Sequence, residues 1–439
     1  MYSIYSLLLT LGFLLMSPLF LLRREKYASG FKQRLGNYPQ FIHEGRKVIW
    51  LHCVSVGETN AARPLVDQLR EAFPDHRLVI STTTRTGQEL AQKIFSGKAA
   101  AIIYFPFDWK FSVCKALENY KPSLVLLMET EIWPRFIREA KQSGANVAIV
   151  NGRLSERSFN RYSRVRSFVQ TVLVDIDLAL MQAESDTKRI LKLGLSENRS
   201  HVTGNLKFDI SDSEDDASLV GDFVRRFGID DRVFTIIAAS THHLEEALML
   251  EAYSYVSSLN STTKFKLIIA PRHPERFANV ADSCRVFCKD ESLQFEQRSN
   301  LLQPNDHKAD IILLDSIGEL RSIYSIANIV VVGGSFIPHG GQSVLEPASF
   351  GKPILIGPHT HNFEEVIRIF LENKALVQGD DSGFPHSKWL SNEIDSLFQN
   401  EERRHRLSTN ALHVMNDHRG ATKRTVGLLK PLLDPKTGS

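Results

Sequence analysis

The chain has little excess of charge and few cysteines. Its 53 lysines and arginines nearly balance 50 aspartates and glutamates, so the net charge of +3 does not indicate a nucleic-acid partner. The four cysteines form no C-x-x-C pair, which favours reduced core thiols in a cytosolic compartment. With 43% hydrophobic and 23% charged residues, the chain is globular, and wholesale disorder is excluded.

Charge is missing altogether from residues 2–22, which are long and apolar enough to be a membrane-anchor helix. A secretory signal would carry its positive charge before the apolar run, whereas Arg23, Arg24 and Lys26 follow it here. Positive charge marks the cytoplasmic side, so we expect residues 1–22 to anchor a chain that otherwise lies in the cytoplasm. Pro18 leaves open whether the helix spans the membrane or lies in its interface.

Strands and helices alternate after this segment, which is typical of parallel, doubly wound sheets. An acidic stretch poor in large apolar residues interrupts the alternation near residue 215. We therefore expect an α/β protein with two Rossmann-like domains, at 23–210 and 219–439, joined by a linker at 211–218. The last helix is expected from about Ser391 to Leu429.

A glycine-rich stretch follows the apolar run Ile329 to Val332. The pairs Gly333-Gly334 and Gly340-Gly341 precede a short helix expected from Gln342 to Phe350. Glycines between a strand and a helix allow close backbone approach to a ligand, and a helix start suits a phosphate. The stretch matches neither the Walker pattern nor G-x-G-x-x-G, and packing alone is the alternative explanation.

Acidic residues follow two apolar strands of the first half. Glu58 begins a helix after one strand, and Glu129 and Glu131 end another. If they face one crevice, one carboxylate can remove a proton while another holds charge. The alternatives are a helix-start carboxylate at Glu58 and salt bridges from the pair to Arg135 or Arg153.

The second half has polar residues at equivalent positions. His242 follows the strand Phe234 to Ala238, with Glu245 and Glu246 opening the next helix, and Arg272 follows the strand Phe265 to Ile269. Because ligands gather at the carboxyl ends of parallel strands, these clusters predict a nucleotide site, with Arg272 as a phosphate ligand.

Two weaker patterns have structural explanations. The pair His359 and His361 lacks a third partner at helical spacing, and Asp175-Ile176-Asp177 reads as a strand-entry turn, so no metal site is predicted. A basic stripe lies beside an apolar helix face and is either a solvated surface or a docking site for anionic lipid; it comprises Arg153, Arg157, Arg161 and Arg164.

Several motifs together carry a family resemblance that extends over essentially the whole chain. In order they are HCVSVGE, STTTRTG, FPFD, METEIWP, NGRLSERS, TGNLKFD, APRHPERF and GGSFIPHGGQSVLEP. The sequence resembles the 3-deoxy-D-manno-octulosonic acid (Kdo) transferases of lipopolysaccharide synthesis. The resemblance implies a GT-B fold, with two Rossmann-like domains facing a central cleft. It also implies an inverting, metal-independent and cofactor-free transfer of Kdo from CMP-Kdo to the lipid A precursor lipid IVA at the inner membrane.

The resemblance also assigns roles to residues. Glu58 matches the general base, and Glu129 and Lys207 match positions of transition-state stabilisation. Residues matching the CMP contacts are Pro271, Arg272, Ile317, Gly318, Glu319, Ser343, Val344, Leu345 and Glu346. The family commonly has asparagine where this chain has Ser343, and serine lacks the second group of the amide.

Two other functions fit the same residues less well. A GT-B transferase that uses a UDP-sugar on a lipid shares the fold and the glycine loop, and competition by CMP or UDP separates the two. A membrane-tethered scaffold with a vestigial nucleotide site is disfavoured by the acids at both strand ends.

Overall fold

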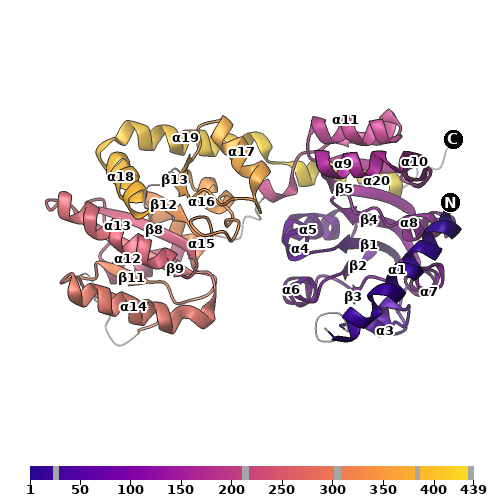
Figure 1. The fold of residues 1–439 in the computed structure, drawn as a ribbon, viewed down its shortest axis with the longest axis horizontal. Helices are drawn as coiled ribbons and strands as arrows, with labels where there is room; N and C mark the ends of the chain where they lie inside the picture. Colours follow the sequence, from indigo (N-terminus) through magenta and orange to yellow (C-terminus); the bar gives the residue numbers. More distant parts are fainter. Residues whose placement is uncertain (23–28, 210–216, 301–307, 381–385, 434–439) are drawn as a thin grey trace. The chain divides into compact units, whose positions relative to one another are not determined.

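The computed structural model describes residues 1–22, 29–209, 217–300, 308–380 and 386–433, and the side chains of residues 17–22 are not described. The chain forms two compact units (Figure 1). Unit 1 comprises Met1–Ser211 and His418–Ser439, and unit 2 comprises Asp212–Asp417. Most of the expected linker lies outside the described residues, and helix α12 (Ala217–Phe227) already begins within it.

The sheet of unit 1 is parallel throughout, with the order β3-β2-β1-β4-β5-β6-β7. Its strands are β1 (Lys47–Cys53), β2 (His76–Thr82), β3 (Ala101–Tyr104), β4 (Pro122–Met128), β5 (Asn146–Gly152), β6 (Leu178–Met181) and β7 (Ser200–Val202). The chain order reverses between β1 and β4. In open α/β sheets the crevice outside such a switch point is where ligands bind.

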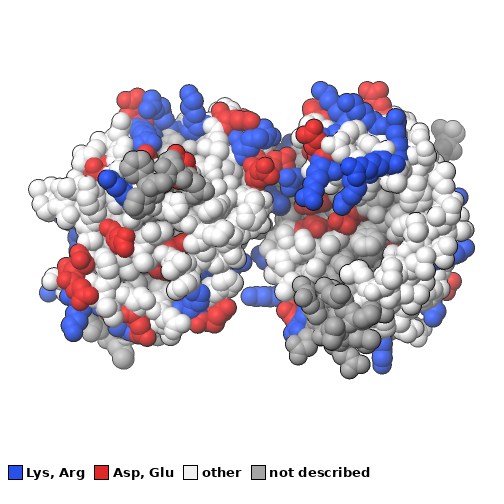
Figure 2. Space-filling view, in the orientation of Figure 1, with Lys and Arg blue, Asp and Glu red and all other residues white. Residues whose placement is uncertain are grey.

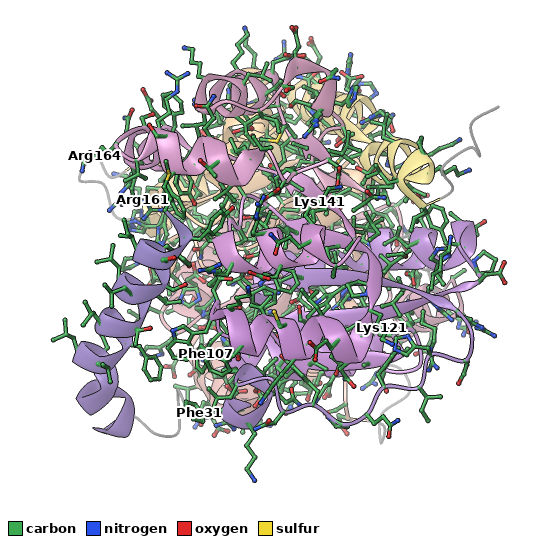
Figure 3. The ribbon with its side chains drawn as sticks, turned by 90° about the vertical axis from the view of Figure 1, so that its right-hand side faces the viewer. Phe31, Phe107, Lys121, Lys141, Arg161 and Arg164 are labelled. Atoms are coloured by element: carbon green, nitrogen blue, oxygen red, sulfur yellow. The ribbon has the colours of Figure 1, made fainter. Side chains whose placement is uncertain are left out.

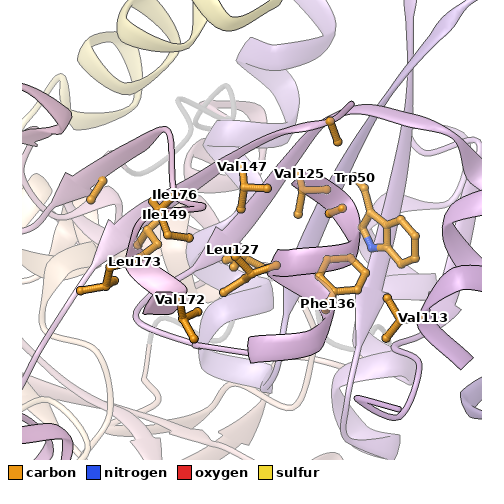
Figure 4. Close-up of a cluster of buried hydrophobic side chains, with 14 of the residues drawn as sticks. Trp50, Val113, Val125, Leu127, Phe136, Val147, Ile149, Val172, Leu173 and Ile176 are labelled. Atoms are coloured by element: carbon orange, nitrogen blue, oxygen red, sulfur yellow. The ribbon is translucent and has the colours of Figure 1, made fainter. Parts of the chain in front are cut away.

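Helices cover both faces of this sheet (Figure 1). They are α3 (Phe31–Arg34), α4 (Val56–Ala61), α5 (Arg63–Ala72), α6 (Arg85–Phe95), α7 (Lys110–Tyr120), α8 (Pro134–Gln142), α9 (Glu156–Ser163), α10 (Arg166–Leu173) and α11 (Glu184–Leu193), with short 3-10 turns η1 (Glu197–Arg199) and η2 (Leu206–Phe208). Alternate residues of each strand enter opposite cores: Trp50 packs with Phe136 of α8, whereas Leu51 packs with α5 and α6 (Figure 4). Burial on both faces explains why these strands are continuous apolar runs.

The sheet of unit 2 is also parallel, with the order β10-β11-β9-β8-β12-β13-β14 and a switch point between β8 and β12. Its strands are β8 (Val233–Thr241), β9 (Lys264–Pro271), β10 (Phe295–Gln297), β11 (Ile311–Leu313), β12 (Ile329–Val332), β13 (Ile354–Ile356) and β14 (Val377–Gln378). Its helices are α12, α13 (Glu245–Leu259), α14 (Phe277–Asp290), α15 (Leu320–Ile323), α16 (Leu345–Ser349), α17 (Glu364–Glu372), α18 (His386–Gln399) and α19 (Glu401–His418), with 3-10 turns η3 (Pro274–Arg276) and η4 (Tyr324–Ile326).

The C-terminal helix differs from the sequence expectation in length and in place. Three helices stand where one was expected from about Ser391 to Leu429, and the last, α20 (Ala421–Leu433), belongs to unit 1 rather than to the domain expected at 219–439. Its apolar face, including Val426 and Leu429, packs in the same core as α5. The Asp209 carboxylate accepts hydrogen bonds of 2.6 Å from the Gly420 and Thr422 amides and thereby holds the start of α20.

Helix α1 (Tyr2–Leu22) lies against unit 1. Its half-buried positions form one face, at residues 2, 5, 6, 9, 10 and 13. The opposite face is apolar and exposed, with Ile4, Leu7, Leu8, Leu11, Leu14, Leu15 and Met16. Within the part of the chain that the structure describes, no helix combines the length and the hydropathy that a membrane crossing requires. The basic flank at Arg23, Arg24 and Lys26 lies outside the described residues.

Candidate active site

Glu58 lies at the carboxyl end of β1, in the first turn of α4. Ser55 is the N-cap: its Oγ accepts from the Glu58 amide (3.4 Å) and donates to Glu58 Oε1 (3.0 Å). The Val54 amide donates to Glu58 Oε2 at 2.7 Å. This Ser-x-x-Glu arrangement resembles a capping box, so the sequence makes the carboxylate both a helix cap and a fixed group at the switch point.

Burial makes Glu58 a weaker acid than an exposed glutamate. The side chain is only 5% exposed, and this desolvation, followed by the negative charge of Glu129, raises its pKa to about 8. The hydrogen bonds from Val54 and Ser55 oppose that rise but do not cancel it. A carboxyl group with a pKa near neutrality is suited to accept a proton from an alcohol.

Glu129 follows β4, the neighbour of β1 at the switch point. Its amide donates to the Val150 carbonyl of β5 (2.9 Å), and its backbone is left-handed, with φ of 54°. Burial and the charge of Glu129 also raise the pKa of Glu131. The structure therefore brings Glu58, Glu129 and Glu131 within electrostatic range of one another. Arg135, one of the salt-bridge partners considered from the sequence, contacts Glu139 instead (3.4 Å).

Lys207 is held at the same edge of unit 1 by asparagines. It lies in η2, where Asn205 Oδ1 accepts from its amide (3.0 Å). Asn151, at the end of β5, accepts from the Leu206 amide at 2.9 Å and has a left-handed backbone, with φ of 53°. Among the described residues, Lys207 Nζ has neither a hydrogen bond nor an ion pair, so this cation is available for a ligand.

Glu245 organises the switch point of unit 2. Its side chain is fully buried, and its carboxylate accepts from the amides of His242 (2.9 Å), Gly334 (2.7 Å), Ser335 (3.1 Å) and Phe336 (3.0 Å). The loop after β12 is thereby tied to the start of α13 at the end of β8. Four amide donors offset the cost of burying a carboxylate.

Close packing explains one glycine in each of the two pairs. A Cβ at Gly333 would lie 2.7 Å from the Ser240 carbonyl and 2.9 Å from Glu245 Oε2. A Cβ at Gly340 would lie within 2.7 Å of Asn362 and His361, and its φ is 102°. Contact with the protein's own groups therefore accounts for Gly333 and Gly340, and ligand approach to the backbone of this loop stays a prediction. The helix α16 also begins later than expected, at Leu345.

A cluster of nitrogen-bearing side chains lies above this packed loop. The His242 ring is 4.1 Å from that of His339 and 5.3 Å from that of His273, and its Nε2 is 3.2 Å from Gln342 Nε2. Burial, followed by the positive charges of His339, His273, Arg276 and Arg272, lowers the pKa of His242 to about 4. A site that disfavours one more positive charge favours an anion.

The segments that carry this cluster can be predicted from the sequence, but the contacts between their side chains cannot. His242 follows β8, His273 follows β9, and His339 and Gln342 lie in the loop after β12. Three histidines at the ends of strands in one predicted sheet were the available signal. The exposed Arg272 completes the edge, and its amide donates to the Thr241 carbonyl at 3.0 Å.

Comparisons with known proteins identify the family of the chain. Residues 29–210 match the family model of 3-deoxy-D-manno-octulosonic-acid transferase (kdotransferase). The chain is 34% identical to the 3-deoxy-D-manno-octulosonic acid transferase of Haemophilus influenzae, over 94% of this chain and 93% of that relative. The chain belongs to the Kdo transferase family. It is 31% identical to the Bordetella pertussis member, covering 88% and 87% of the two chains. The protein is therefore an enzyme, a glycosyltransferase.

Solved structures that resemble this Kdo transferase show the architecture alone. The UDP-GlcNAc 2-epimerase from Neisseria meningitidis matches with a TM-score of 0.56 and 15% identity, over 88% of this chain and 100% of that one. A glycosyltransferase from Rickettsia africae matches with a TM-score of 0.54 and 11% identity, over 90% and 100%. Both support the α/β fold with two Rossmann-like domains.

The remaining positions that match the family's CMP contacts differ in their exposure and in their own contacts. Ile317 is 73% exposed, and Gly318 has open space around it. The Glu319 carboxylate accepts from Arg298 Nε (3.0 Å) and Ser316 Oγ (2.7 Å), so it also fixes the turn. Val344 and Leu345 are buried, and only their backbone groups can reach a ligand.

Three further positions flank these residues. The Ser343 hydroxyl accepts from the amide of Leu345, the first residue of α16, at 3.4 Å, and Val344 is the N-cap of that helix. Glu346 is partly buried, and its charge adds to the effect of burial in raising the pKa of Tyr324. Pro271 is buried at the end of β9, opposite Thr241 of β8.

Other candidate positions of the Kdo transferase have structural roles. Asp175 pairs with Arg138 (3.1 Å) and Asp177 with Lys141 (2.6 Å), in the turn expected before β6. No group of three histidine, cysteine or acidic side chains is placed to hold a metal among the described residues. A cavity of about 390 Å³ lies in unit 1 between the starts of β2 and β3, at the opposite edge of the sheet from Glu58 and Glu129.

Proposed function

We propose that this enzyme transfers Kdo from CMP-Kdo to the lipid A precursor lipid IVA in lipopolysaccharide synthesis. The observation that carries the proposal is the buried Glu58, with its raised pKa, beside Glu129 at the switch point of unit 1. A second anion-favouring edge, with Arg272 and His242, lies at the switch point of unit 2. The donor therefore binds unit 2, and the acceptor binds unit 1.

The chemistry of such a transfer needs one base. Glu58 takes the proton of an acceptor hydroxyl while that oxygen bonds to the anomeric carbon of Kdo. The bond from this carbon to the phosphate oxygen breaks at the same time, and its electron pair leaves with CMP. Attack opposite the leaving group inverts the anomeric centre, as with the single base of inverting glycosidases. The step uses no metal ion.

Charge at the reacting centre assigns the supporting roles. The sugar carbon becomes cationic in the transition state, and the carboxylate of Glu129 stabilises it. Negative charge grows on the departing phosphate. The positive charges of Lys207 and Arg272 stabilise it. The neutral His242 and Gln342 add hydrogen-bond donors to the same edge without a charge that burial would oppose.

Removing Arg272 should weaken donor binding selectively. Arg272→Ala deletes an exposed guanidinium beside the His242 cluster, so the KM for CMP-Kdo should rise roughly 10- to 100-fold, as for a lost charged hydrogen bond. Steady-state kinetics with varied CMP-Kdo measure this change. Arg232→Ala is the matched control, because Arg232 is exposed in the same unit and pairs with the neighbouring Asp230. Equal KM values in the two variants would exclude Arg272 from the donor site.

The pH profile should report the coupling of the acids. Since Glu58 must lose its proton to act as a base, kcat/KM should fall as the pH drops through about 8, the pKa of Glu58. Glu129→Gln removes the negative charge that raises this pKa, so the acid limb should move to lower pH even though the rate maximum falls. An unmoved limb would refute electrostatic coupling between Glu58 and Glu129. Glu71→Gln, at an exposed position of α5, controls for the loss of a charge.

Helix α1 provides the membrane attachment in this proposal, lying in the plane of the inner membrane on its cytoplasmic side. Figure 3 shows α1 along one edge of unit 1 with side chains directed outward, and with Arg161 and Arg164 near the same edge. Figure 2 shows basic side chains gathered over α9 and α11. An exposed apolar face next to basic residues is typical of a helix bound to an anionic surface. The same arginines can contact the phosphate groups of lipid IVA.

Polar substitutions on the outer face of α1 should release the protein from vesicles. Leu8 and Leu15 are 62% and 81% exposed, so Leu8→Gln with Leu15→Gln should not disturb the fold. Burial of a leucine contributes about 1.5–3 kcal/mol, so affinity for vesicles with anionic lipid should fall at least about tenfold. Sedimentation with vesicles measures it, and Leu259→Gln, at an exposed position of α13, is the control. Unchanged sedimentation would exclude this face from the membrane.

A further inference from the structure

We propose that α1 also positions the active-site acids, through a hydrogen-bonded connection from Tyr5 to Asp108 to the first turn of α8. The inference rests on the proposed function, because it assigns α1 a part in the transfer step in addition to membrane attachment. Tyr5 and Asp108 are positioning residues, since neither reaches the reacting atoms.

Asp108 is the centre of this connection. It lies between β3 and α7 and is 2% exposed. Its Oδ2 accepts from the Tyr5 hydroxyl at 2.7 Å and from the Arg135 amide at 3.0 Å, and its Oδ1 accepts from the Phe136 amide at 2.7 Å. One buried carboxylate therefore joins α1 directly to the start of α8.

Helix α8 depends on this carboxylate for its cap. Its own N-cap residue, Trp133, gives no side-chain hydrogen bond, and Pro134 follows at the first helical position. The next two amides, of Arg135 and Phe136, would lack partners without Asp108. A carboxylate at a helix N-terminus is also favoured by the helix dipole. Asp108, from a distant part of the same chain, therefore supplies the cap that residues 129–133 do not provide.

The acid-bearing segment 129–133 is held by hydrogen bonds at its start, and Ile132 and Trp133 pack against the core next to α8. At one end the Glu129 amide donates to the Val150 carbonyl, and the Thr130 hydroxyl donates to the Arg153 carbonyl. At the other end the segment runs directly into α8. A shift of the first turn of α8 is therefore transmitted to Glu131 and Glu129. The left-handed backbone of Glu129 costs energy and depends on its surroundings to persist.

Other contacts of α1 converge on the same two segments. Ser6 Oγ accepts from Arg135 Nε at 3.0 Å, and Thr10 Oγ1 accepts from Trp109 Nε1 at 3.1 Å. The ring of Phe13 lies 4.9 Å from that of Trp109. Positions 5, 6, 10 and 13 share one face of a helix, so this face is matched to the Asp108 loop and to α8. A helix with no role besides anchoring would not require these polar side chains.

Tyr5→Phe tests the connection with little change in packing. The phenyl ring can keep the stacking on Phe168, whose centroid lies 5.6 Å away, while the hydrogen bond to Asp108 is lost. With detergent-dispersed lipid IVA, where membrane attachment is not needed, kcat should fall at least about fivefold. The KM for CMP-Kdo should stay within about twofold, and the acid limb of the pH profile should move to lower pH as Glu129 withdraws from Glu58.

Tyr2→Phe is the matched control, because the Tyr2 hydroxyl contacts Asp175 (3.4 Å) rather than the start of α8. Equal kcat values and equal pH profiles in the two variants would overturn the proposal. Amide hydrogen exchange gives a readout without turnover: residues 129–136 should exchange faster in Tyr5→Phe than in Tyr2→Phe. Unchanged exchange also overturns it. Faster exchange in Tyr5→Phe, together with a wild-type protein that transfers no Kdo, would mean that the proposed function is wrong although α1 positions this segment.

Discussion

Replacing Glu58 with glutamine should reduce Kdo transfer roughly 10²- to 10⁴-fold, the usual contribution of a general base. Glutamine has nearly the same shape and keeps an acceptor for the Val54 amide, but it cannot take a proton. Binding of CMP-Kdo should be unchanged, since the donor contacts are proposed for unit 2. Single-turnover transfer and calorimetric titration with CMP-Kdo measure the two quantities. Turnover at the wild-type rate would exclude Glu58 as the base.

The same substitution should stabilise the fold at higher pH. The folded-state pKa of Glu58, about 8, lies above the ordinary value of 4.5, so the folded protein binds more protons than the unfolded chain between these values. Stability contributed by this group is therefore lost as the pH rises from about 4.5 to 8. Denaturant unfolding should show Glu58→Gln gaining stability over wild type at pH 8 relative to pH 5. Glu71→Gln should show no such gain.

Truncating Glu245 should have the largest effect on the stability of unit 2. Glu245→Ala leaves the amides of His242, Gly334, Ser335 and Phe336 without their acceptor in a buried loop. Removing one partner of a buried charged network typically costs about 3–5 kcal/mol, which is the loss expected in the free energy of unfolding. Urea unfolding measures it, with Glu251→Ala at an exposed position of the same helix as control. A loss below about 1 kcal/mol would contradict the assigned role.

Continuous apolar runs made the strands easy to predict. Ile329 to Val332 is β12 as expected. The acids after β1 and β4 could be selected as site candidates because ligands gather at the carboxyl ends of parallel strands. Strand order is not written in such a pattern, because every buried parallel strand has the same composition. The neighbouring positions of Glu58 and Glu129 became clear only with the pairing of β1 and β4.

Contacts distant in sequence account for what the pattern could not give. Gly333 reads as a ligand-approach glycine until Glu245 is seen to occupy the space beside it. The last helix reads as continuous from Ser391, yet Gly420, with φ of 85°, ends one helix before α20 packs on unit 1. The capping of α8 by Asp108 joins residues 28 positions apart and has no local signal.

Product analysis by mass spectrometry tests the central claim most directly. The purified protein is incubated with lipid IVA and CMP-Kdo, and in parallel with lipid IVA and UDP-sugars. The proposal predicts lipid that carries Kdo, with CMP released in equal amount, and no such product from Glu58→Gln. Unmodified lipid with intact CMP-Kdo, or transfer from a UDP-sugar instead, would contradict it.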